Sequence, residues 1–298
     1  MAETVTTRFL VATNEGVTQL SSRRGIDHLC EALPKTRLGR TARALLRSRL
    51  LSIDPAQPAP TQWSPRLLHL GGAPEALQRV NEARHHVLLT SAAAPCDQPR
   101  HAQAARLVAR VLAAAMSGDL VDLDSDQLLA ASPSPGGTTE PERFVLGNEW
   151  IGVFVTLAQE RDAEHCIRVG TAGMHRFALP EVMASEVPYG HMLTAANILR
   201  ALAFRLLSDG GIPAKFTLDA GDLLRFWGAR PAPAGRLSLR LTPAESDCSG
   251  CSKALAVLPP TRRGTGLESG RATGCGDPVW WEERAAEAMP KLVSASPE

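Results

Sequence analysis

The sequence has few aromatic residues, few lysines and no long apolar run. Phe, Trp and Tyr make up 4% of the 298 residues, and Tyr189 is the only tyrosine. Only four of the 32 basic residues are lysines, a skew that, with abundant Ala and Pro, is typical of GC-rich bacterial coding. No apolar stretch reaches the roughly 20 residues needed to cross a bilayer, so we expect no membrane partner.

The N-terminal residues lack the features of a secretory signal, because they contain Glu3, no basic region and no apolar run of sufficient length. The chain is also large enough to fold without disulfides. We therefore expect a cytoplasmic protein whose six cysteines are free thiols. They are Cys30, Cys96, Cys166, Cys248, Cys251 and Cys275.

The overall composition is that of a globular protein of nearly neutral charge. Hydrophobic residues make up 44% and charged residues 21%, and the formal net charge is +1. These values argue against wholesale disorder and against a globally basic coat for nucleic acid.

Three regions differ in composition along the chain. Residues 1–65 form an Arg-rich segment that ends in a Pro-rich linker at 54–65. Residues 66–228 carry the clearest hydrophobic periodicity and are predicted to be the core domain. Residues 229–298 are rich in Pro, Gly, Arg and Ser, so we expect a poorly ordered tail.

The periodicity predicts a mixed set of helices and strands. Helices are expected at 74–83, 100–115 and 194–207, and strands at 7–13, 85–91, 120–123, 149–157, 165–171 and 215–218. This order predicts the α+β class, with a mixed, largely antiparallel sheet and helices packed on one of its faces.

Residues 20–50 contain eight basic side chains and only two acidic ones, and we call this segment the basic stripe. Arg37, Arg40, Arg43 and Arg47 recur every three or four residues and would share one face of a helix. Nucleic acid is not an expected partner of this chain, and this face is the only part of the sequence that could contact it, through phosphates. No aromatic residue interleaves with it, so base stacking is unsupported, and a solvated helix face is the competing interpretation.

The tail contains half of a zinc-binding motif. Cys248 and Cys251 have the C-x-x-C spacing of a zinc knuckle, and Cys275 follows. A tetrahedral site needs a fourth ligand, which the sequence does not identify. Zinc bound by these three cysteines is therefore one interpretation, and incidental thiols are the other.

An acidic run, Asp119, Asp122, Asp124 and Asp126, follows the helix predicted at 100–115. Alternate carboxylates at the end of a strand can point toward one cation. An EF-hand loop is excluded, because Gln127 stands where its glycine would be required. Ordinary loop carboxylates explain the run equally well.

The segment 165–191 concentrates polar groups beside glycines. His175, Arg176 and Glu181 lie close together in sequence, and His191 follows. They would supply a base, an anion clamp and an orienting carboxylate, so these four residues are the candidate catalytic set. A hairpin with satisfied surface polar groups is the structural alternative.

Residues 173–182, GMHRFALPEV, also carry a family resemblance. With the strand and helix patterns around them, they resemble a bacterial domain family of unknown function that carries a G-L-x-x-F-G-L-P-E motif. Met174 and Ala178 stand where that motif has Leu and its second Gly. The resemblance spans about residues 85–226 and implies a similar fold and a bacterial origin.

The familiar catalytic signatures are absent from the sequence. It contains no P-loop, no H-E-x-x-H, no G-x-S-x-G and no strand-borne G-x-G-x-x-G. We therefore expect a binding or regulatory module with a site for a small molecule or a protein near residues 170–191. The alternative is a small-molecule enzyme that acts on an anionic substrate through the candidate catalytic set.

Overall fold

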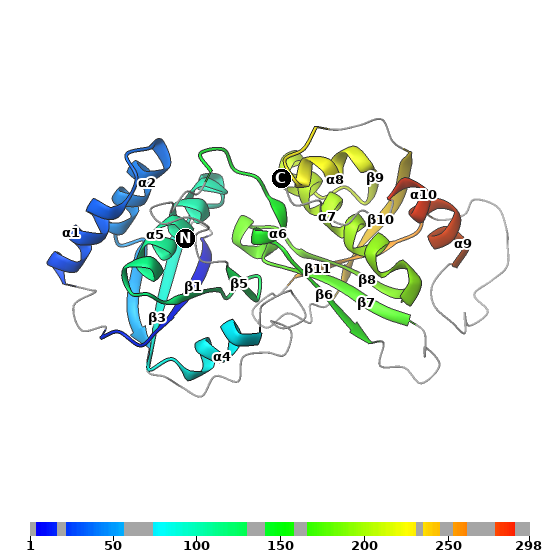
Figure 1. The fold of residues 1–298 in the computed structure, drawn as a ribbon. Coiled ribbons are helices and arrows are strands. Elements are labelled where there is room, and N and C mark those ends of the chain that lie inside the picture. The colour runs from blue at the N-terminus through cyan, green and yellow to red at the C-terminus, as the bar shows by residue number, and fades with distance from the viewer. Residues whose placement is uncertain are drawn as a thin grey trace. The chain divides into compact units, whose positions relative to one another are not determined.

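The computed structural model describes residues 4–16, 22–56, 74–129, 141–157, 166–230, 235–244, 253–260 and 278–289 (Figure 1). The chain forms two compact units. Unit 1 comprises Met1–Phe144 and Arg176–Ala178, and unit 2 comprises Val145–His175 and Leu179–Glu298. The main division therefore falls at residue 144, which differs from the expected boundaries at 65 and 228.

Unit 1 is built on a five-stranded antiparallel sheet with the strand order β2-β3-β1-β4-β5. The central strand β1 pairs with β3 along its whole length, from Val5 opposite Ala93 to Thr13 opposite His85. The strands are β1 (Val5–Thr13), β2 (Leu51–Ala56), β3 (His85–Ala93), β4 (Asp119–Asp122) and β5 (Gln127–Leu129).

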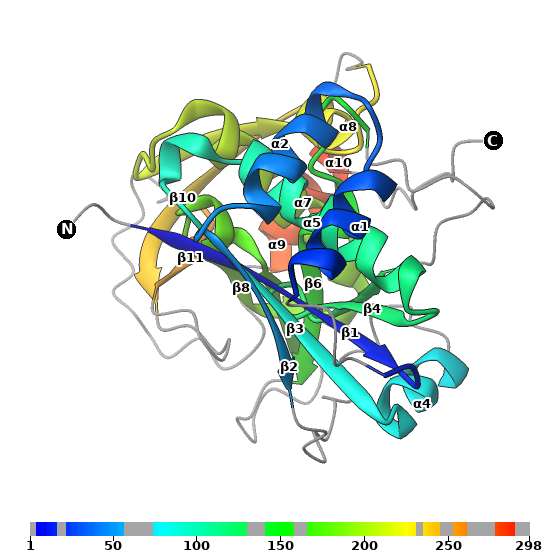
Figure 2. The ribbon, with the colours of Figure 1, turned by 90° about the vertical axis from the view of Figure 1, so that its left-hand side faces the viewer.

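Helices cover both faces of the first sheet, because successive residues of β1 point to opposite sides. Phe9 and Val11 belong to the larger apolar cluster with α1, α2 and α5, whereas Leu10 and Ala12 meet Val80 of α4. Figure 2 shows α1, α2 and α5 gathered over β1 and β3. The helices are α1 (Arg23–Ala32), α2 (Arg37–Leu46), α4 (Pro74–Glu82) and α5 (Arg100–Ala115), with a short 3-10 turn at Pro95–Asp97.

Unit 2 contains a six-stranded sheet with the order β6-β7-β8-β11-β10-β9. Strands β8 and β11 are parallel, and the other neighbours are antiparallel. The strands are β6 (Gly152–Leu157), β7 (Cys166–Ala172), β8 (Glu181–Pro188), β9 (Lys215–Asp219), β10 (Arg236–Ala244) and β11 (Ala254–Leu258).

The long helix α7 is the main helical component of unit 2 and is apolar around most of its circumference, as a buried helix requires. It ends at Gly210, which adopts φ 66°. Asp219 and Asp222 form a capping box at the start of α8. The helices are α6 (Gly147–Trp150), α7 (Met192–Asp209), α8 (Ala220–Phe226), α9 (Pro278–Trp280), a π-helical turn (Trp281–Ala285) and α10 (Ala286–Ala288), with 3-10 turns at Met174–Phe177 and Tyr189–His191.

The α+β class is confirmed, with two largely antiparallel sheets in place of one. The tail beyond residue 229 contributes more order than expected, because β10 and β11 lie inside the second sheet. The buried leucines of β10, Leu237, Leu239 and Leu241, alternate with more exposed residues. Within the part of the chain that the structure describes, no helix has the length and apolarity to traverse a membrane.

Gly118 allows β4 to approach β1 closely. A Cβ atom at this position would lie 2.8 Å from the carbonyl oxygen of Ala12 and 2.8 Å from Cγ1 of Val11. We expect Gly118→Ala to lower the free energy of unfolding by about 1–3 kcal/mol through overpacking, as measured by urea denaturation. Gly211→Ala is the control, since a Cβ there meets nothing within 4 Å. An equal loss in both variants would contradict the steric explanation.

Candidate functional site

Glu181 is the first residue of β8, and its buried carboxylate accepts hydrogen bonds from the backbone of the turn that follows β7. Oε1 accepts hydrogen bonds from the N–H groups of Gly173 at 2.9 Å, Met174 at 2.9 Å and His175 at 3.3 Å. Oε2 accepts a hydrogen bond from the Thr171 hydroxyl at 2.8 Å. The carboxylate thereby satisfies buried polar groups that would otherwise cost free energy.

The glycine and glutamate of the GMHRFALPEV segment therefore have structural roles. Gly173 adopts φ 110°, a conformation that side chains disfavour. Phe177 is 5% exposed and contacts the ring of Phe144 edge-on at 5.7 Å between centroids. Glu181 holds the turn through its hydrogen bonds with three successive backbone N–H groups.

His175 is the one member of the candidate catalytic set that the structure places beside Glu181. Its Nδ1 lies 3.2 Å from Oε1 of Glu181, and 24% of its side chain is exposed. A carboxylate in this position orients an imidazole ring. The two residues are thus brought together, although Glu181 is shared with three backbone groups.

Arg176 belongs to unit 1, where its side chain is fully buried. Its guanidinium donates to both carboxylate oxygens of Asp122, at 2.8 and 2.5 Å, and lies 3.7 Å from Asp124. The guanidinium carbon lies 6.0 Å from the ring centroid of Phe9. Arg176 therefore acts as the buried counterion of an acidic pair.

The acidic run is explained by arginine pairing. Asp122 also accepts the backbone N–H groups of Asp124 and Ser125, at 3.0 and 3.2 Å. Asp124 accepts both the backbone N–H and the Nε of Arg8, at 2.9 and 3.1 Å. Among the described residues, no group of three or more His, Cys, Asp or Glu side chains is arranged to hold a metal ion.

His191 lies against the C-terminal helical segment of unit 2. Its ring centroid is 6.2 Å from that of Trp281, and its Nε2 is 3.9 Å from Oε1 of Glu282. The four candidate catalytic residues therefore divide among three environments: the turn, the buried acidic pair and this aromatic contact.

The candidate zinc ligands Cys248, Cys251 and Cys275 lie outside the described residues. Cys166, which is 2% exposed at the start of β7, is disulfide-bonded, so the expectation of six free thiols is wrong at this residue. Cys30 and Cys96 are free. Disulfides are rare in reducing compartments, and the cytoplasmic location stays a prediction.

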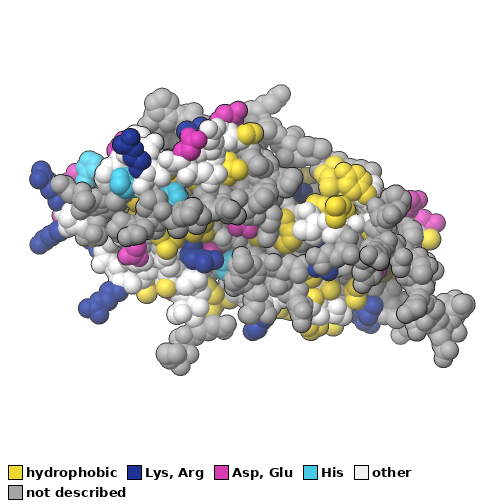
Figure 3. Space-filling view, turned by 90° about the horizontal axis from the view of Figure 1, so that it is seen from below, with side chains coloured by type: hydrophobic (Ala, Val, Ile, Leu, Met, Phe, Trp, Pro, Cys, Tyr) yellow, Lys and Arg dark blue, Asp and Glu magenta, His cyan; other side chains and the backbone are white. Residues whose placement is uncertain are grey.

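The basic stripe is partly used inside unit 1. Arg43 donates to the carbonyl oxygens of Cys30, Leu33 and Pro34, so it satisfies the end of α1. Arg47 pairs with Asp27 at 3.4 Å. In the view of Figure 3, Lys and Arg side chains lie in several separate places. Phosphate contacts by the remaining arginines stay a prediction.

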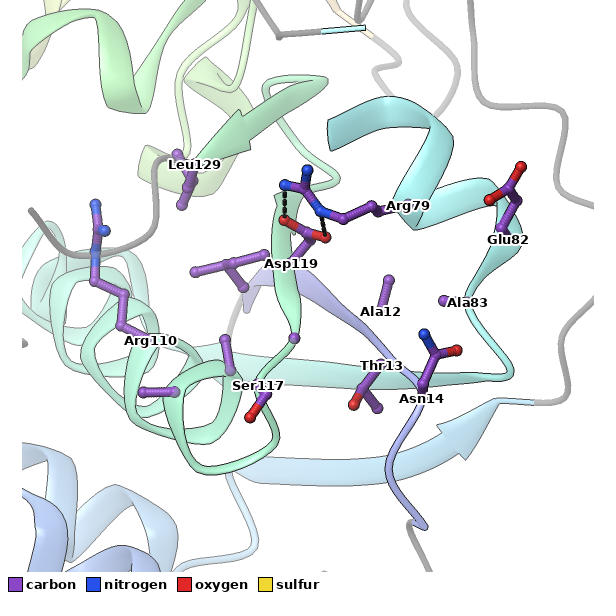
Figure 4. Close-up of a pocket in the computed structure, with 14 residues that line it drawn as sticks. Ala12, Thr13, Asn14, Arg79, Glu82, Ala83, Arg110, Ser117, Asp119 and Leu129 are labelled. Carbon is purple, nitrogen blue, oxygen red and sulfur yellow. Dashed lines mark hydrogen bonds and ion pairs between the residues drawn. The ribbon is translucent and has the colours of Figure 1, made fainter. Parts of the chain in front are cut away.

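A pocket of about 400 Å³ opens in unit 1 between α4, α5, the end of β1, the start of β4 and the last residue of β5 (Figure 4). Its volume falls in the range typical of small-molecule sites. The pocket is open because many of its lining residues have short side chains, and Gly118 has none. Apolar lining residues are Ala12, Ala83, Ala113, Ala114, Leu120 and Leu129.

Four charged residues give this pocket its polar character. Arg79 binds Asp119 through two hydrogen bonds of 2.8 Å, which raise the pKa of Arg79. Arg110 and Glu82 also line the pocket. The lining thus carries two positive and two negative side chains.

Sequence reasoning missed this pocket because its walls come from five separate elements, β1, α4, α5, β4 and β5. The available signal was the run of small residues at the end of α5, Ala113–Ala115, followed by Ser117 and Gly118. Ser117 adopts φ 46°, which turns the chain sharply from α5 into β4. The register of β1 with β4 places Asp119 opposite Ala12, and Asp119 binds Arg79 from α4.

Arg176→Met tests the buried counterion. The change leaves Asp122 buried without its cation, so we expect the free energy of unfolding to fall by about 3–5 kcal/mol in chemical denaturation. Adding Asp122→Asn is expected to restore part of the loss. Arg47→Met is the control, because its exposed pair with Asp27 contributes about 0–1 kcal/mol. Similar losses in both single variants would refute the assignment.

Comparisons with known proteins leave the geometry as the basis for a functional assignment. The chain matches no protein-family model, no curated protein and no solved structure.

Proposed function

We propose that the protein is a binding module whose unit 1 takes a small organic molecule into the pocket between α4 and α5. The observation that carries this proposal is the 400 Å³ pocket at the junction of five elements, with one hydrogen-bonded ion pair in its wall. A concave, mostly apolar site with a few polar groups is the usual form of a small-molecule site.

The character of the lining favours a ligand with an apolar body and a polar end. The alanines of α5 and the two leucines offer apolar surface. The Arg79–Asp119 pair offers donors and acceptors at one wall, as Figure 4 shows. Because the charges of the lining balance, an uncharged or zwitterionic molecule fits better than a strongly charged one.

The binding function expected from the sequence is thereby kept, and its site is moved away from residues 170–191. In that segment, Glu181 is bonded to the turn and Arg176 to Asp122. Those bonds occupy the groups that a ligand would need.

The alternative enzyme has one observation in its favour, the contact of His175 with Glu181. A carboxylate on Nδ1 prepares the imidazole to act as a base. The enzyme hypothesis, however, also needs Arg176 to bind the anionic substrate. The guanidinium of Arg176 is already bound to the buried carboxylate of Asp122. The geometry therefore supports binding better than catalysis.

Filling the pocket from its exposed side tests the proposed function. Ala114 and Ala115 are both exposed in the last turn of α5, and only Ala114 lines the pocket. We expect Ala114→Phe to weaken the binding of pocket ligands by about tenfold or more, which corresponds to about 1.4 kcal/mol. Ligands are identified by saturation-transfer NMR with a library of uncharged and zwitterionic fragments.

Ala115→Phe is the matched control, since it makes the same change on the same helix turn. It is expected to leave fragment affinities unchanged. The proposal fails if no fragment binds the unmodified protein, or if both phenylalanine variants retain the same affinities.

A further inference from the structure

Arg200, in the middle of α7, is held by two amide oxygens and an aromatic ring, all of them neutral groups. Its Nε donates to Oδ1 of Asn148 at 3.0 Å, and its Nη1 donates to Oδ1 of Asn197 at 3.1 Å. Its guanidinium carbon lies 5.5 Å from the ring centroid of Trp227, a distance at which a cation is attracted to the ring. Three contacts thus fix the plane of the guanidinium without neutralising it.

Two glycine turns in unit 2 bring the contacts of Arg200 into place. Gly147, with φ 47°, directly precedes Asn148, and Gly228, with φ 77°, directly follows Trp227. A Cβ on Gly228 would lie 3.1 Å from Cγ1 of Val145, so the two turns pack against each other. Asn197 is three residues before Arg200 on the same helix and therefore lies on the same face.

Two other arginines of this chain, one fully buried and one partly exposed, bind carboxylates. Arg176 pairs with Asp122, and Arg205, on the same helix as Arg200, binds Asp209 at 2.8 Å and Asp222 at 3.5 Å. Arg200 has no carboxylate partner within the described part of the chain. Burial lowers its pKa to about 10, which reflects the cost of a cation removed from water with no anion beside it.

One edge of this guanidinium is not completely buried. Nη2 of Arg200 takes part in neither of the two hydrogen bonds and is not among the fully buried polar atoms that lack a partner, so part of it is accessible to solvent. Asn148 directs its oxygen at Arg200, which leaves its amide N–H groups as further donors. A planar fork of donors with a fixed orientation matches the oxygens of a carboxylate or a phosphate.

We propose that Arg200 and Asn148 form an oxyanion-binding site of unit 2, which recognises a carboxylate or phosphate group of a small molecule. Asn197 and Trp227 are positioning residues that hold the guanidinium in plane. This site is separate from the pocket of unit 1 and does not depend on the function proposed for that pocket.

The test is a titration of the full-length protein followed through the arginine Nε–H signals in NMR spectra. The probes are sodium phosphate and sodium acetate, with sodium chloride at matched ionic strength as the reference. We expect the Arg200 signal, assigned by its loss in Arg200→Lys, to shift saturably with at least one oxyanion and not with chloride. Saturation by phosphate alone, or by acetate as well, distinguishes the two sources of the oxyanion.

Thermal unfolding provides a second readout that separates binding from a purely structural role. Arg200→Met is expected to abolish the saturable rise in Tm that the oxyanion gives, whatever its own effect on basal stability. Arg205→Met, the control on the same helix, is expected to keep that rise. The proposal is overturned if the Arg200 signal follows chloride as closely as the oxyanions, or if Arg200→Met keeps the full rise.

Discussion

The bond network of Glu181 is the constraint on which the centre of the chain depends. Its carboxylate gathers the N–H groups of Gly173, Met174 and His175, and so fixes the path of the turn after β7. The next residue, Arg176, then enters unit 1 and neutralises Asp122. One buried acid thus positions the cation that another pair of buried acids requires, and both interactions are strong because water is excluded from them.

Much of the fold was predictable, because local patterns decide local structure. The periodicity of α5 gave its bounds, 100–115, without error, since its apolar residues recur every three or four positions. Short β-rich runs predicted strands at 7–13 and 85–91, which are β1 and β3 in the structure. The second sheet was not predictable in the same way, because β11 pairs in parallel with β8, more than 60 residues away in sequence. Such pairing depends on tertiary contacts that no local pattern reports.

The polar residues were the least predictable part of the chain. A carboxylate run such as Asp122 and Asp124 is compatible with a cation site, and the deciding fact is the arrival of Arg176 from 54 residues away. The same limit applies to the pocket, whose walls meet only after β1 pairs with β4. By contrast, the sequence pointed to the segment that holds Gly173 and Glu181. In the structure both residues shape the turn after β7, Gly173 through its positive φ and Glu181 through its hydrogen bonds.

The membership of Arg176–Ala178 in unit 1 has a consequence for synthesis on the ribosome. A nascent chain that has reached residue 144 already contains every strand of the first sheet, yet it lacks the counterion of Asp122. The buried ion pair of unit 1 therefore cannot form until the polypeptide has grown past residue 176. A gene fragment that ends at the boundary between the units would encode a protein with an uncompensated acid at its centre.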